Sequence, residues 1–215
     1  MIKNLIFDFD GTIVNSKDLV IHLYNELAYE NNYKKLSSSD IEYLINLPIS
    51  ERIKLLDIPI HKIPSLLFEV LNKYRKHIHS LHTADGIVDL LYALKAKGFR
   101  LGIISSNAAG TIREFLKKND MDMFENIYSA KNVFGKHYAI NSFMKKYRLE
   151  KEETFYVGDE IRDIISCKKS GVPIIAVTWG YDSRELLSGG NPDFIADHPA
   201  EILRIACNLQ IPDHT

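Results

Sequence analysis

Two aspartates, Asp8 and Asp10, follow an apolar run near the start of the chain and precede Gly11. The run, which includes residues 2 and 5–7, predicts a short strand buried on both faces, as in a parallel sheet. A buried carboxylate is costly unless a cation offsets its charge. Alternate side chains of an extended strand share a face, so both carboxylates can approach one ion, and oxygen ligands of this kind suit Mg²⁺.

Two other interpretations fit parts of this segment. An Asp-Gly pair is common in turns, which explains Gly11 but not the paired acids. A calcium-binding loop requires glycine at its sixth position and glutamate at its twelfth. Counted from Asp8, these places hold Ile13 and Leu19. The calcium loop is therefore excluded, and the plain turn stays open.

The composition limits the class of protein. The chain has 215 residues, a net charge of −1 and 46% hydrophobic residues, which suits one domain or one domain with an insertion. The nearly neutral charge gives no reason to expect nucleic acid or a membrane surface as a partner. No apolar run reaches membrane length. Cys167 and Cys207 lie far apart, so we expect reduced thiols in a cytoplasmic protein.

The chain from residue 16 to residue 79 has a helical pattern. Leucines at positions 19, 23 and 27 repeat with the spacing of one helix face. Ser38 or Ser39 and then Ser50 are placed to cap two further helices, and Pro64 begins another. No clear strand interrupts these helices. We therefore expect a small helical unit inserted directly after the first strand, with hinges at residues 14–16 and 79–84.

From residue 83 the pattern alternates between helix and strand. Helices are predicted at 85–97, 111–118, 139–147 and 161–169, and strands at 101–104, around 127–128, and at 154–157, 174–177 and 194–196. Such alternation predicts right-handed crossovers and a parallel sheet covered by helices on both faces. Sites in these α/β sheets form at the carboxyl ends of the strands.

Polar residues follow several of these strands. The second strand ends in Ser105 and Ser106, the fourth leads into Asp159, Asp163 follows four residues later, and Lys136 lies in a loop between them. With the first two aspartates, this set suits a phosphate ester bound with Mg²⁺. The cations neutralise the phosphoryl oxygens while hydroxyl groups orient them. One carboxylate can attack phosphorus and form an aspartyl-phosphate, and a second can act as general acid and base.

This arrangement resembles the haloacid dehalogenase-like phosphatases, which carry four motifs in the same order. The matching segments are DFDGT (residues 8–12), IIS (103–105), Lys136 and VGDxxxD (157–163). His137 follows Lys136 where many relatives have proline, which leaves Lys131 as the alternative. The tail VTWGY (177–181) and the helical insertion resemble the phosphoglycolate phosphatase-like branch, in which the insertion is a mobile cap. The resemblance implies a Rossmann-like three-layer α/β core of residues 1–15 and 80–215 and an all-α helical cap of residues 16–79.

The resemblance also implies a role for each matched residue. Asp8 would be the nucleophile and a Mg²⁺ ligand, and Asp10 the general acid and base, with its backbone carbonyl also on the metal. The other implied Mg²⁺ ligands are Asp159 and, directly or through water, Asp163. The implied phosphate- or substrate-binding residues are Ser105, Ser106, Lys136, Thr12 and Arg52, and Thr12 would also position Asp10.

The choice of reaction depends on single positions. Asp10 argues against dehalogenation, and Val20 stands where a sugar phosphomutase of this fold would have histidine. We therefore expect a Mg²⁺-dependent phosphatase for a small phosphorylated metabolite. Arg52 lies in a segment that resembles a cap loop facing the site, and contact with an anionic substrate group there would favour phosphoglycolate.

Several alternatives stay open. Inorganic pyrophosphate, sugar phosphates and nucleoside monophosphates are possible substrates. The mutase is disfavoured rather than excluded. A phospho-acceptor module that binds phosphate without turnover is a further alternative, although Asp10 and the helical insertion favour an enzyme. The sequence leaves both a monomer and a homodimer open.

Overall fold

A six-stranded parallel sheet forms the centre of the protein in the computed structural model, which describes residues 2–130 and 135–208. The strands are β1 (Asn4–Phe7), β4 (Arg100–Ser105), β5 (Phe124–Ser129), β6 (Thr154–Gly158), β7 (Ile174–Val177) and β8 (Phe194–Ala196). Their order in the sheet is β5-β4-β1-β6-β7-β8. The first strand therefore lies inside the sheet, paired with β4 on one side and β6 on the other.

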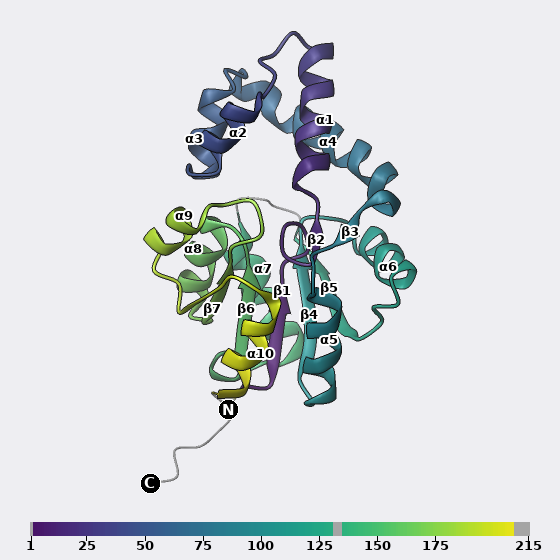
Figure 1. Ribbon diagram of the computed structural model, residues 1–215, viewed down its shortest axis with the longest axis vertical. Coiled ribbons are helices and arrows are strands. Elements are labelled where there is room, and N and C mark those ends of the chain that lie inside the picture. Colours follow the sequence, from purple (N-terminus) through teal and green to yellow (C-terminus); the bar gives the residue numbers. More distant parts are fainter. Residues whose placement is uncertain (1, 131–134, 209–215) are drawn as a thin grey trace.

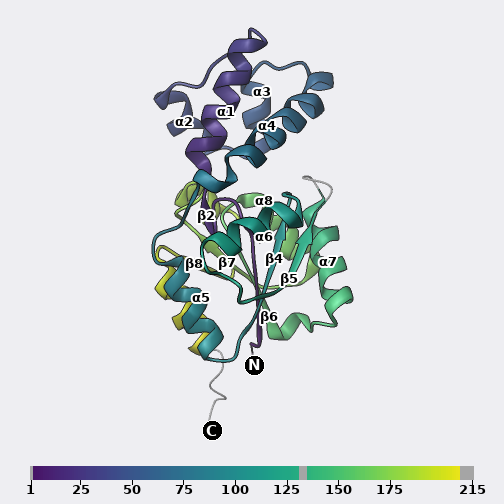
Figure 2. The ribbon, with the colours of Figure 1, turned by 90° about the vertical axis from the view of Figure 1, so that its right-hand side faces the viewer.

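Helices cover both faces of this sheet (Figures 1 and 2). Helices α5 (Ile87–Ala96), α6 (Ala109–Lys118) and α10 (Pro199–Asn208) pack on one face, and α7 (Lys136–Tyr147), α8 (Ile161–Ser170) and α9 (Arg184–Gly189) on the other. The side chains of β1 alternate accordingly, because Leu5 and Phe7 belong to the first core and Ile6 to the second. The predicted Rossmann-like α/β fold is confirmed.

The helical insertion stands above the carboxyl edge of the sheet (Figure 1). It consists of α1 (Lys17–Glu30), α2 (Ser38–Leu44), α3 (Ile49–Leu55) and α4 (Ile63–His77), with short 3₁₀ turns at Ile60–Lys62 and Ile78–Ser80. The insertion has its own small core, which includes Tyr24, Leu27 and Leu66. We call it the cap. The division into a core of residues 1–15 and 80–215 and a cap of residues 16–79 stays a prediction.

The two connections to the cap form a short antiparallel ribbon of β2 (Val14–Asn15) and β3 (His82–Thr83). The sequence analysis expected hinges there but no strands. Two-residue strands carry no periodic signal, which is why they were missed. None of the helices in the part of the chain that the structure describes is long and apolar enough to cross a membrane.

Several predicted helix starts were wrong by one or a few residues. Helix α2 is capped by Ser37, which exchanges hydrogen bonds with Asp40 in a capping box, rather than by Ser38 or Ser39. Pro48, not Ser50, precedes α3. Helix α7 begins at Lys136 rather than at residue 139, so this lysine belongs to the first turn of a helix and not to a loop. The sequence analysis also missed α9 and α10.

Candidate active site

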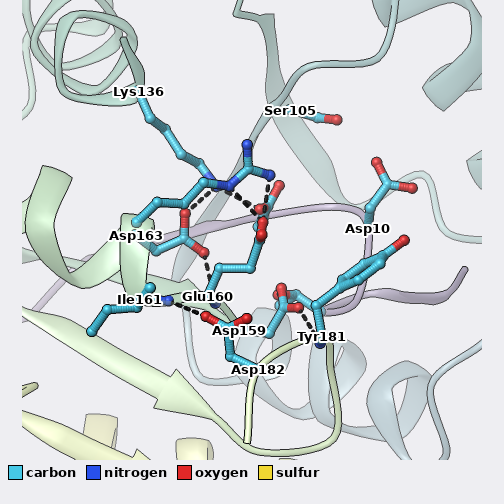
Figure 3. Close-up of polar contacts among 12 residues, drawn as sticks. Asp10, Ser105, Lys136, Asp159, Glu160, Ile161, Asp163, Tyr181 and Asp182 are labelled. Atoms are coloured by element: carbon cyan, nitrogen blue, oxygen red, sulfur yellow. Dashed lines mark hydrogen bonds and ion pairs between the residues drawn. The ribbon is translucent and has the colours of Figure 1, made fainter. Parts of the chain in front are cut away.

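The predicted polar residues converge where β4, β1 and β6 end side by side (Figure 3). Asp8 follows β1, Ser105 is the last residue of β4, and Asp159 follows β6. Parallel neighbours end at the same edge of a sheet, so three segments far apart in sequence meet there. The Asp8 side chain is fixed locally, because its Oδ1 accepts a hydrogen bond of 2.7 Å from the backbone N–H of Phe9.

Lys136 joins two of these carboxylates from the start of α7. Its Nζ donates to Asp8 Oδ2 at 2.5 Å and also to Asp163 Oδ1. All three residues are buried. Burial alone would lower the pKa of Lys136, but Asp163 and Asp8 raise it well above its ordinary value. Burial raises the pKa of Asp8 to about 6, against the opposing effect of Lys136. This lysine therefore stays charged and offsets the buried acids.

A group of three buried acids could hold a divalent cation. Carboxylate oxygens of Asp8, Glu160 and Asp163 lie within 4.8 Å of one another. Hard oxygen donors of this kind suit Mg²⁺. Glu160 also accepts a hydrogen bond of 2.6 Å from Arg162 Nε, and burial raises the pKa of Glu160. The donor set therefore fits the predicted metal.

Glu160 is a candidate ligand that the sequence analysis missed. It directly follows Asp159 in the fourth motif, and a third acid in that segment was the signal that could have indicated it. Asp163 is tied to the same residue, because its Oδ2 accepts a hydrogen bond of 3.2 Å from the backbone N–H of Glu160. The start of α8 thereby holds both acids in place.

Asp159 is engaged elsewhere. Its Oδ1 accepts a hydrogen bond of 2.7 Å from the Thr12 hydroxyl, and its Oδ2 accepts one of 2.8 Å from the backbone N–H of Tyr181. A Cβ atom on Gly11 or Gly180 would lie 2.1 Å or 2.2 Å from Asp159 Oδ2. Asp159 is thus enclosed by the chain and lies outside the group of converging acid oxygens. Its role as a metal ligand stays a prediction.

Thr12 contacts another residue than the one that the sequence predicted. We expected this residue to position Asp10 and to bind phosphate. Instead its side chain is fully buried and donates to Asp159. The partner lies 147 residues away in sequence, so no local pattern could have indicated it.

Asp10 lies apart from Lys136 and Asp163 (Figure 3). Its Oδ1 accepts a hydrogen bond from the hydroxyl of Tyr74 in the cap, and its Oδ2 accepts one of 2.6 Å from Asn107 Nδ2. Burial raises the pKa of Asp10 to about 6, and the Tyr74 hydrogen bond opposes this shift. A carboxyl group that titrates near neutral pH is suited to both giving and taking a proton. The sequence analysis did not identify Tyr74.

The remaining predicted residues line one cavity with Asp8, Asp10 and Lys136. Ser105 and the half-buried Ser106 contribute to its wall, and so does Arg52 from α3. The Arg52 guanidinium forms an ion pair with Asp182 of the core and donates from Nε to the Leu47 carbonyl at 2.7 Å. Asp182 in turn accepts a hydrogen bond of 2.6 Å from the backbone N–H of Ile161 at the start of α8. Lys131, the alternative to Lys136, lies outside the described residues.

Comparison with known proteins agrees with this geometry. The protein combines a parallel α/β sheet, buried acids at the carboxyl edge of that sheet and a helical cap above them. Residues 5–177 match the family model of the haloacid dehalogenase-like hydrolases, and the chain belongs to that family. The predicted family and the assignment as an enzyme are thereby confirmed.

Relatives that match along nearly the whole of both chains are named for two different activities. The chain is 27% identical over 206 residues to a phosphoglycolate phosphatase of Synechococcus elongatus, covering 95% of this chain and 97% of that protein. It is 28% identical over 217 residues to the pyrophosphatase PpaX of Anoxybacillus flavithermus, covering 95% and 96%.

Solved structures share the fold. A predicted phosphatase from Clostridium acetobutylicum superposes with a TM-score of 0.83 at 20% identity, covering 98% of this chain and all of that one (100%). A haloacid dehalogenase-like family protein, SP0104, from Streptococcus pneumoniae superposes with a TM-score of 0.80 at 23% identity, covering 95% and 98%.

Proposed function

We propose that the protein is a Mg²⁺-dependent phosphatase that hydrolyses a small phosphate monoester through an aspartyl-phosphate on Asp8. The observation that carries this proposal is that two carboxyl groups, those of Asp8 and Asp10, line one cavity but have different surroundings. Asp8 contacts the charged Lys136, whereas Asp10 contacts neutral donors, among them Tyr74 and Asn107. Carboxyls placed in such different environments can take different roles, one as nucleophile and one as acid and base.

In the first step, Asp8 attacks phosphorus, and a new Oδ–P bond forms as the P–O bond to the alcohol breaks. Asp10 gives its proton to the departing alkoxide. Lys136 and the Ser105 hydroxyl orient the phosphoryl oxygens. In the second step, the ionised Asp10 takes a proton from a water molecule that attacks phosphorus. The Asp8–phosphate bond breaks, inorganic phosphate leaves, and both carboxyls return to their first state.

The acids beside this position would hold the metal. Asp8, Asp163 and Glu160 are the residues whose oxygens converge, and Asp159 and the Asp10 backbone carbonyl are the further predicted ligands. Bound Mg²⁺ supplies positive charge that neutralises the phosphoryl oxygens and offsets the buried acids.

The cap would close the site against water. Contacts that join cap and core at the cavity include Tyr74 to Asp10, Arg52 to Asp182, Lys17 to the Gly180 carbonyl at 3.3 Å, and the backbone N–H of Ser183 to the Ile45 carbonyl at 3.0 Å. These contacts support a closed cap, and the hinges remain those predicted at residues 14–16 and 79–84.

Phosphoglycolate and pyrophosphate are the reference substrates, because relatives named for both are similar to the chain along its whole length. Both need cations beyond those that bind the transferred phosphoryl group. Two cap cations line the cavity, and each has a partner in the core: Arg52 pairs with Asp182, and Lys17 donates to the Gly180 carbonyl at 3.3 Å. We therefore place monoesters that carry no second anionic group ahead of both.

The experiment is phosphate release from a panel of esters and pyrophosphate, with Mg²⁺ or with a chelator, for the wild type, Asp8→Asn and Asp10→Asn. We expect turnover only with Mg²⁺ and loss in both variants. With nitrophenyl phosphate, whose leaving group needs no proton, Asp10→Asn should still form the phosphorylated enzyme and accumulate it, as seen by intact mass spectrometry after an acid quench. Turnover that survives Asp8→Asn would overturn the mechanism.

A further inference from the structure

The cavity that contains Asp8 and Asp10 continues deep into the cap. Its volume is about 340 Å³. The floor is polar and belongs mainly to the core. The walls are almost entirely apolar and come from all four cap helices and the segments between them, including Val20, Ile21, Leu36, Ile41, Ile45, Ile49, Ile53, Leu56, Ile63, Val70 and Leu71. One hollow thus combines a site for a charged group with a site for an apolar one.

Many of the apolar side chains that face the cavity are only half-buried. Helix α3 contains no buried residue, and its Ile49 and Ile53 are only half-buried where they line the cavity. Val20, Ile21 and Leu71 are half-buried in the same way. The small core of the cap borders the same hollow, because its Tyr24, Ile58 and Leu66 also line the cavity. Protein interiors are normally close-packed, so apolar surface gathered around a hollow indicates a binding site.

The two cap cations that line the cavity, Lys17 and Arg52, each contact the core. Arg52 is held by a buried carboxylate, since the side chain of Asp182 is only 1% exposed. Lys17 is half-buried and bonded to a backbone carbonyl of the core. A substrate carboxylate or a second phosphate placed against the apolar walls would lose its hydration without compensation.

We propose that the substrate is a phosphate monoester of a bulky apolar alcohol, alkyl or aromatic, whose hydrocarbon part fills the cap cavity while its phosphate lies on the core. This proposal rests on the proposed phosphatase function and names its substrate class. The volume sets the size of the hydrocarbon part. An apolar cavity of about 150 Å³ binds benzene, so the present cavity accepts roughly two rings or an alkyl chain of similar volume.

The test is a series of alkyl phosphates of increasing chain length, together with phenyl and naphthyl phosphate, phosphoglycolate and pyrophosphate, all with Mg²⁺. We expect kcat/KM to rise by about fourfold for each added methylene and to level off when the cavity is full. Phosphoglycolate and pyrophosphate should then fall below the longer esters. A flat series, or phosphoglycolate as the best substrate, would overturn the proposal.

A binding experiment separates failure of this proposal from failure of the phosphatase function. The matching alkyl phosphonates, which cannot be hydrolysed, are titrated into the wild type by calorimetry with Mg²⁺ present. Affinity that increases with chain length, with an increasingly negative heat-capacity change, supports the apolar site even if no ester is turned over. Affinity independent of chain length overturns it, whatever the esterase result.

Two substitutions of Ile53 test whether the hydrocarbon part of the substrate binds in the cap. Ile53→Trp fills part of the cavity and should move the levelling-off point to shorter chains, whereas Ile53→Ala enlarges it and should move that point to longer chains. Misfolding cannot produce shifts in opposite directions. Ile60 lies in the cap, 83% exposed and away from the cavity, so Ile60→Trp is the matched control. If neither Ile53 variant changes the chain-length profile, the assignment to the cap is wrong.

Discussion

Replacing Lys136 with methionine tests the centre of the proposed mechanism. Methionine keeps most of the length and apolar volume of the lysine side chain, which also lies over the Tyr156 ring with Nζ 5.2 Å from its centroid. The substitution removes only the charge that contacts Asp8 and Asp163. Both activity and stability should respond, for separate reasons.

The stability effect follows from burial. Removing one partner of a buried ion pair costs about 3–5 kcal/mol, because the other charge is left uncompensated. Asp8 already has a pKa of about 6 in the folded protein, and loss of the lysine raises that pKa further. A folded-state pKa above the unfolded one destabilises the fold as pH rises through it. The gap between the variant and the wild type should therefore be largest at pH 8 and shrink toward pH 5.

Urea denaturation at pH 8 and pH 5.5, in a chelator, measures this effect, and kcat/KM with saturating Mg²⁺ measures the catalytic one. We expect Lys136→Met to lower kcat/KM by about 10²–10³-fold, as for loss of a charge-stabilising donor. Lys131→Met, at the alternative position, is the matched control and should retain activity. Near-normal activity of Lys136→Met, together with loss in Lys131→Met, would refute the assignment of the phosphate-binding lysine.

Three further predictions concern the neighbouring acids. Because burial raises the pKa of Asp8 to about 6, its ionisation destabilises the metal-free fold above that pH by up to about 3 kcal/mol. Mg²⁺ should therefore raise the melting temperature more at pH 8 than at pH 5.5, and equal shifts in calorimetry would contradict this account. Tyr74→Phe removes a donor that favours ionised Asp10, so the basic limb of the pH profile of kcat/KM, where Asp10 loses the proton it must give, should move to higher pH; an unchanged limb would mean that Asp10 does not set it. Gly180→Ala places a Cβ 2.2 Å from Asp159 Oδ2 and should lower kcat/KM by about 10²-fold through misplacement of that acid, whereas Gly189→Ala, with nothing within 4 Å of the new Cβ, should not.

The sequence was sufficient for the sheet and for the place of the site. Most core strands are short apolar runs, and β1, the strand before Asp8, is buried along its whole length. Because parallel strands end at one edge, polar residues after β1, β4 and β6 had to meet. The meeting of these residues depends only on the order of helices and strands. Errors of several residues in the predicted helix boundaries, including the start of α7, therefore did not affect this prediction.

Contacts between distant segments could not be predicted in the same way. Tyr74 and Asp10 are 64 residues apart in sequence, and Arg52 and Asp182 are 130 apart. A tyrosine or arginine on a helix is usually part of a solvated face, and nothing in the local pattern distinguishes these two. Only the position of the cap over the sheet brings them to the cavity.

Chemistry and selectivity depend on different kinds of contact in this protein. The acids of the core are held by neighbouring backbone, as in the hydrogen bond from Phe9 N–H to Asp8, within a sheet that is buried on both faces. The walls of the cap cavity are half-buried apolar side chains without such partners. Substitutions in these walls can alter which alcohol is accepted without moving the groups that act on phosphorus. Tyr74 is the exception, because it belongs to the cap and bonds to Asp10. Through Tyr74, occupation of the cavity can be coupled to the proton-transfer group, so that the cap acts on both recognition and catalysis.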